Sequence, residues 1–165
     1  MRRPPRLLFA ALLLLAVVFI FATVDRLPAR IATHFGSAGF PNGWMTRGAY
    51  GSFLLAFAVL VPVLLVAVIG GLPHAFPDRI NIPNRAYWLA PERRQESLAY
   101  LRDHAYRLGS LMVLFASGIH LLILEANTVV PPRLPGSVLV GMLAVFLVGM
   151  MTWIWTLYAR FRRTP

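Results

Sequence analysis

Four long apolar segments constrain this sequence more strongly than any other feature, because each is long enough to cross a lipid bilayer. They cover residues 7–24, 52–69, 108–124 and 137–158, and only His120 in them ionises near neutral pH. Roughly 20 helical residues span a hydrocarbon core of about 30 Å. Since backbone groups find no water at that depth, each segment is predicted to be a helix. The sequence therefore predicts an all-α, polytopic membrane protein with a single domain of four transmembrane helices.

The sixteen basic residues are all arginines, and the two sides of the predicted membrane receive them unequally. Four of them fall in the predicted outer loops 25–51 and 125–136, namely Arg26, Arg30, Arg47 and Arg133. Because arginine is enriched in cytoplasmic loops, both termini and the loop 70–107 are predicted to be cytoplasmic. The net charge of +10 is thus explained mainly by the arginines that orient the chain in the membrane. Its expected partners are the bilayer and anionic headgroups on the cytoplasmic side, and no nucleic acid.

The inner loop 70–107 is too long to be only a turn. Its second half places Leu98, Leu101 and Ala105 at helical spacing. We expect Pro91–Tyr106 to form an interfacial helix that lies on the membrane surface and leads into the third span. The same surface is a possible docking site for a cytoplasmic or membrane protein partner.

In the fourth span Gly141, Val145 and Gly149 are spaced by four, and Ala144 is adjacent on the same side. Small residues in such a pattern allow two helices to approach closely. This face is therefore predicted to pack against another helix.

The outer loop 25–51 has the most distinctive composition, with glycine and proline interspersed among aromatic residues. Compact loops of this kind are often functional. The tripeptide Pro41-Asn42-Gly43 predicts a turn. The candidate ligand-binding residues of this loop are His34, Phe35, Gly39, Asn42 and Trp44.

Two motifs in the chain resemble one known family. The first reads Leu27-Pro28-x-x-Ile31-x-x-His34-Phe35-x-x-x-Gly39-x-Pro41-x-Gly43-Trp44. The second reads Asn81-Ile82-Pro83-Asn84-x-x-Tyr87-Trp88-Leu89-x-Pro91. Both are similar to segments of the bacterial domain of unknown function 1648 family. That family includes the multi-span immunity protein against the sporulation-delaying peptide toxin. The resemblance implies a multi-pass protein of the bacterial inner membrane that recognises an extracytoplasmic ligand.

The chain departs from this family at two positions of the first motif. Members usually have a proline where this chain has Ala32, and often an acidic residue where it has Asn42. Other residues of the two motifs are interpreted as structural, namely Leu27, Pro28, Pro41, Gly43, Asn81, Pro83, Asn84, Tyr87 and Trp88.

His120 stands out because an ionisable side chain within a span is costly and is a candidate for function. Glu125 is expected at the outer end of the same span and joins His120 among the candidate ligand-binding residues. The two lie five positions apart, about 140° around a helix, so they do not share a face. We predict no metal and no cofactor, because no close ligand spacing occurs. The alternative for His120 is a neutral imidazole that hydrogen-bonds another helix in the packing.

Three functions remain open. The leading hypothesis is an immunity- or sensor-type binding protein whose outer loop recognises an extracytoplasmic peptide or protein. The second is an accessory subunit of a membrane complex. The third is a small membrane enzyme that uses His34 or His120, although no serine-hydrolase or phosphate-binding motif occurs and no catalytic residue is assigned.

Overall fold

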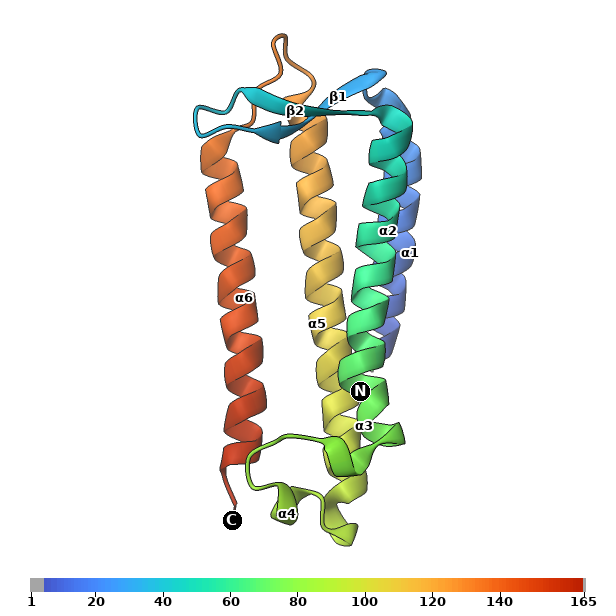
Figure 1. The fold of residues 1–165 in the computed structure, drawn as a ribbon, viewed down its shortest axis with the longest axis vertical. Helices are drawn as coiled ribbons and strands as arrows, with labels where there is room; N and C mark the ends of the chain where they lie inside the picture. Colours follow the sequence, from blue (N-terminus) through green and yellow to red (C-terminus); the bar gives the residue numbers. More distant parts are fainter. Residues whose placement is uncertain (1–4, 165) are drawn as a thin grey trace.

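The computed structural model describes residues 5–164 and consists mainly of four long helices that run side by side (Figure 1). These are α1 (Pro5–Thr23), α2 (Arg47–Val66), α5 (Pro91–Ala126) and α6 (Gly136–Arg162). All four belong to helical stretches long and apolar enough to cross a membrane. The prediction of a mostly helical chain with four candidate transmembrane helices is confirmed.

Short elements connect the long helices. α2 continues through a π-helical turn at Ala67–Gly71 into α3 (Leu72–Ala75), and α4 covers Arg85–Trp88. Single 3-10 turns occupy Val24–Arg26 and Pro77–Arg79. All the connections after α2 and before α5 lie at one end of the bundle, which we call the loop end (Figure 1).

The segment predicted to be a compact outer loop is instead a β-hairpin, which is the exception to an all-helical fold. β1 (Arg30–Phe35) and β2 (Pro41–Thr46) pair antiparallel and lie across the other end of the bundle, the hairpin end (Figure 1). The turn predicted at 41–43 falls within β2, and the chain reverses at 36–40. The pairing is specified by Ile31 opposite Met45, because both side chains pack into the core below.

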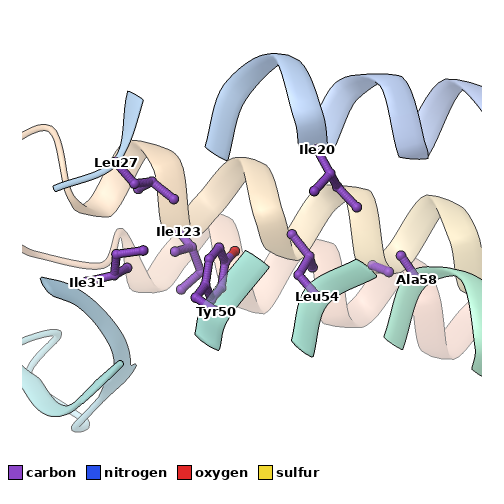
Figure 2. Packing of buried hydrophobic residues seen from close by; sticks show 8 residues of the cluster. Ile20, Leu27, Ile31, Tyr50, Leu54, Ala58 and Ile123 are labelled. Atoms are coloured by element: carbon purple, nitrogen blue, oxygen red, sulfur yellow. The ribbon is translucent and has the colours of Figure 1, made fainter. Parts of the chain in front are cut away.

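The bundle core is organised around α5, which packs against α1, α2 and α6. Beneath the hairpin, buried residues from α1, β1, α2 and α5 meet in one cluster (Figure 2). Within it, Ile31 from β1 and Tyr50 from α2 lie close to Ile123 from α5 (Figure 2). The hairpin is therefore part of the hydrophobic core and covers the ends of three helices.

The third span and the expected interfacial helix form one continuous helix, α5, so Pro91–Tyr106 continues the axis of the span. Two contacts account for this course, one with the segment just before α5 and one with α6. The Ser97 hydroxyl donates to the Trp88 carbonyl at 2.8 Å, and the buried His104 side chain packs against Trp153 of α6. These contacts hold the first turns of α5 in line with the rest of the helix.

The face of α6 that meets α5 differs in part from the predicted one. Gly149 does contact α5, because a Cβ there would lie 3.1 Å from Leu111. Gly141 has no atom of another segment within 4 Å of such a position, and Ala144 is exposed. The side chains that contact α5 recur at spacings of four and three and include Met142, Phe146 and Trp153. A spacing of four throughout drifts around the helix, which explains the error for Gly141 and Ala144.

Candidate functional site

The hairpin is fixed to the bundle by Asn127, the residue that follows α5. The Ala32 N–H donates to its Oδ1 at 3.0 Å, and its Nδ2 donates to the Ala32 carbonyl at 3.0 Å. The same Nδ2 donates to the Ile123 carbonyl at 2.9 Å. The side-chain amide thus supplies β1 with the donor and acceptor that a neighbouring strand would offer.

The hairpin turn is held by a second attachment, to the loop between α5 and α6. The Leu134 N–H donates to the Gly39 carbonyl at 3.0 Å. Gly39 has a φ of 79°, and a Cβ at this position would lie 2.9 Å from the Leu134 carbonyl oxygen. Both the left-handed conformation and the close approach require glycine here.

The first motif mainly builds the hairpin. His34 lies opposite Gly43, and a Cβ on Gly43 would lie 2.9 Å from the His34 Cβ. Glycine therefore leaves the space that the histidine occupies. Leu27 and Ile31 are buried in the core, where they anchor the segment before β1 and β1 itself.

An open cavity of about 750 Å³ lies between the hairpin turn, the end of α5 and the beginning of α6. Glu125 and Arg133 are the charged residues of its wall, and Phe35 and Leu139 contribute apolar surface. The Arg133 guanidinium lies 5.3 Å from the centre of the Phe40 ring. A cavity of this size with few charged groups on an apolar wall is typical of a ligand-binding site.

The structure divides the seven candidate ligand-binding residues into three groups. Those that line the cavity are Phe35, Gly39 and Glu125. Those exposed on the hairpin beside the cavity are His34, Asn42 and Trp44. The remaining one, His120, is fully buried in the bundle.

His120 joins three helices through a buried hydrogen-bonded chain. Its Nδ1 lies 2.9 Å from the Tyr50 hydroxyl of α2, and its Nε2 lies 2.8 Å from the Thr23 Oγ1 of α1. The Thr23 hydroxyl donates its one proton to the Phe19 carbonyl at 2.6 Å. It must therefore accept from Nε2, which assigns the proton to Nε2 and makes Nδ1 the acceptor of the Tyr50 hydroxyl. With a neutral imidazole, both ring nitrogens of His120 and the hydroxyls of Tyr50 and Thr23 all have hydrogen-bond partners.

The candidate histidines and the carboxylate of Glu125 lie apart from one another in the structure. His34 is exposed on the hairpin and Glu125 lines the cavity, whereas His120 is enclosed by α1, α2 and α5. Within residues 5–164, no group of three or more His, Cys, Asp or Glu side chains is arranged to hold a metal ion. Asp25 lies 3.9 Å from Arg47 in an exposed ion pair.

The second motif caps the C-terminal end of α6. Asn84 has a φ of 51°, and its Nδ2 donates to the carbonyls of Phe161 at 3.1 Å and Arg162 at 2.8 Å. The Trp88 Nε1 donates to the Phe161 carbonyl at 2.9 Å. Carbonyls at a helix end lack partners within the helix, so this motif satisfies them from the inner loop. Asn81, Pro83 and Tyr87 shape or flank the same segment.

The sequence does not predict the contacts of three residues, namely Asn127, which holds the hairpin, and Thr23 and Tyr50, which bind His120. Each uses a polar side chain at a helix end, where such residues are ordinary. Asn127 follows His120 by seven positions, about two helical turns, so the sequence places it on the same side of the helix as His120. Its pairing with β1 depends on the tertiary fold, and the spacing of residues along the sequence does not predict that pairing.

Four candidate transmembrane helices and a hairpin docked across their ends define a multi-pass membrane protein. Residues 11–66 match the family model described as Domain of unknown function (DUF1648), which covers most of α1, the hairpin and α2. The match supports the resemblance of the first motif to that family over this segment. No curated protein and no solved structure matches the chain.

Proposed function

We propose that this protein is an immunity- or sensor-type receptor of a bacterial inner membrane that binds an extracytoplasmic peptide or protein at its hairpin end. The observation that carries the proposal is the cavity between the hairpin turn and the α5–α6 loop. Its rim is held by hydrogen bonds at Ala32 and Gly39, so the site is preorganised rather than formed on binding.

The chemistry of the site supports a peptide ligand. Glu125 offers a carboxylate to an amine or guanidinium, and Arg133 offers a guanidinium to a carboxylate. The apolar wall accommodates aliphatic side chains, and Trp44 and Phe40 are exposed on the adjoining hairpin. Exposed aromatic residues beside a charged cavity are typical of protein-recognition surfaces.

Arginine placement supports the orientation, with the hairpin end outside and both termini in the cytoplasm. The hairpin end carries only Arg26, Arg30, Arg47 and Arg133 among the described arginines. The loop end carries the rest, which is the distribution expected of cytoplasmic segments.

Single-cysteine labelling tests the orientation, because the chain has no cysteine of its own. In intact spheroplasts, a membrane-impermeant maleimide is expected to label Ser37→Cys at the turn. Thr164→Cys at the opposite end is expected to react only after permeabilisation. The reverse pattern would refute the orientation.

Binding is tested with the purified protein in nanodiscs, exposed to concentrated culture medium from its native host and analysed for retained peptides. Ala38→Trp fills the cavity mouth, and Ala29→Trp adds the same bulk at an exposed hairpin-end position that does not line it. We expect one peptide or protein to be retained by the wild type and Ala29→Trp and lost by Ala38→Trp. Equal retention by both variants would contradict binding in the cavity.

The accessory-subunit alternative is favoured by α6, whose apolar span is exposed along its length. It predicts copurification of one membrane protein with the wild type and both tryptophan variants alike. That result would replace the receptor proposal.

A further inference from the structure

A second open cavity, of about 660 Å³, lies at the loop end beside the last turn of α6. It is lined by Trp88, Ala159, Arg160, Arg162, Arg163 and Thr164. The uncharged part of α6 ends at Ala159, just before Arg160, so the cavity lies where a hydrocarbon core would end and headgroups begin.

Three guanidinium groups give this cavity a strong positive charge. Arg160 is held in place by an ion pair with Glu96 and by the Trp88 ring, whose centre lies 4.5 Å from its guanidinium. In residues 5–164, neither Arg162 nor Arg163 forms an ion pair with a carboxylate. The carbonyls of Phe161 and Arg162 already accept from Asn84 and Trp88, so the helix end does not neutralise the arginines.

An exposed apolar stripe on α6 leads to this cavity. It contains Val148, Met151, Trp155 and Tyr158, each 46–67% exposed. Arg162 continues the same face, because these residues follow one another at spacings of three and four. The Arg162 guanidinium lies 5.8 Å from the centre of the Tyr158 ring, so the stripe and the charged site are continuous.

We propose that this cavity and the stripe form a binding site for an anionic phospholipid. The lipid phosphate binds Arg162 and Arg163, with Arg160 as the fixed wall, and the acyl chains lie along the stripe toward Val148. Arginine suits phosphate because its planar guanidinium can donate two hydrogen bonds in parallel. The apolar stripe beside the arginines favours a lipid over a soluble phosphate or a nucleic acid, neither of which would cover it.

The test measures lipid binding by native mass spectrometry of the detergent-solubilised full chain. The probes are dioleoyl phosphatidylglycerol and dioleoyl phosphatidylcholine. The double variant Arg162→Gln/Arg163→Gln removes two charges from the cavity. Arg79→Gln/Arg94→Gln removes two exposed charges from the same end but outside it. Both pairs keep the helices intact, which circular dichroism verifies.

We expect the wild type to prefer phosphatidylglycerol and the cavity variant to bind it roughly thirtyfold more weakly, or roughly fivefold per arginine. The control pair is expected to change binding less than threefold. Equal losses in the two variants would overturn the proposal in favour of diffuse surface attraction. Competition by glycerol 3-phosphate at the concentration of the lipid would overturn it in favour of a soluble anion.

Trp155→Ala provides an independent arm, because it shortens the stripe and leaves every charge in place. We expect weaker phosphatidylglycerol binding and no change in the small affinity for glycerol 3-phosphate. Unchanged lipid binding would show that the acyl chains do not use the stripe. Neither arm involves the hairpin-end cavity, so failure here leaves the proposed receptor function to be judged by its own experiment.

Discussion

The buried chain Tyr50–His120–Thr23 yields a quantitative prediction about stability. Tyr50→Phe removes the hydroxyl that donates to Nδ1 of His120 and leaves a buried acceptor without a partner. The net loss of a hydrogen bond costs about 1 kcal/mol, and an unsatisfied buried group costs about 1–3 kcal/mol. Measured hydrogen bonds between membrane helices reach only about 1.7 kcal/mol. We therefore expect Tyr50→Phe to lower the free energy of unfolding by about 1.5 kcal/mol.

A double variant at Tyr50 and His120 separates the effect of the hydrogen bond from the effect of side-chain packing. His120→Leu alone leaves the Tyr50 hydroxyl unpaired, while Thr23 keeps its bond to the Phe19 carbonyl. In Tyr50→Phe/His120→Leu neither unpaired group remains, so the double variant should cost no more than either single one. The coupling free energy is expected to be about 1–2 kcal/mol.

Unfolding in mixed micelles, titrated with dodecyl sulfate and followed by far-ultraviolet circular dichroism, measures these values. Tyr106→Phe is a matched control, since the Tyr106 hydroxyl forms no hydrogen bond within the described chain and should change stability by less than about 0.5 kcal/mol. Additive costs for the two single variants, within about 0.5 kcal/mol, would refute the hydrogen-bonded chain. If the double variant also binds the extracytoplasmic ligand normally, His120 serves packing alone.

Three further perturbations follow from the geometry. Asn127→Leu should release the hairpin by removing both hydrogen bonds to Ala32, seen as faster amide exchange at Ala32 with the helices still protected; unchanged exchange would contradict the docking. Gly109→Ala should lower the free energy of unfolding by about 1–3 kcal/mol, because its Cβ would lie 2.7 Å from Phe9 and 2.8 Å from Val66. Gly48→Ala, which has open space around it, is the control and should leave the free energy of unfolding unchanged or raise it in the same dodecyl sulfate titration. Asn84→Ala should cost about 1 kcal/mol and increase amide exchange at the carboxyl end of α6, and a change confined to α4 would refute its capping role.

The sequence predicts the long helices well because the bilayer leaves the chain so few alternatives. Apolar segments of this length must satisfy their backbone groups internally, whatever they pack against. The helix ends are less predictable. α2 begins at Arg47, five positions before the apolar segment, because the Thr46 hydroxyl caps it by accepting from the Ala49 N–H. That signal is short and is easily overlooked in a glycine-rich loop.

Contacts between distant segments account for the rest of what the sequence does not reveal. The hairpin depends on Ile31 and Met45 packing into the same hydrophobic core. The straight course of α5 depends on the contacts of its first turns with Trp88 and Trp153. The candidate site shows the same limit. Phe35, Gly39 and Glu125 are each candidates by residue type, but the cavity they share lies between segments that meet through the hydrogen bond of Leu134 to Gly39.

The departure from the family pattern at Ala32 has a structural explanation in Asn127. A proline at this position would have no N–H to donate, so Oδ1 of Asn127 would lose its partner at the edge of β1. Alanine keeps that donor, and it is also small enough to be fully buried between the hairpin and the bundle. The hydrogen bonds between Ala32 and Asn127 therefore dock the hairpin on the bundle. A proline at position 32 would keep only the carbonyl that accepts from Nδ2 of Asn127, so alanine is what allows both hydrogen bonds of this attachment to form.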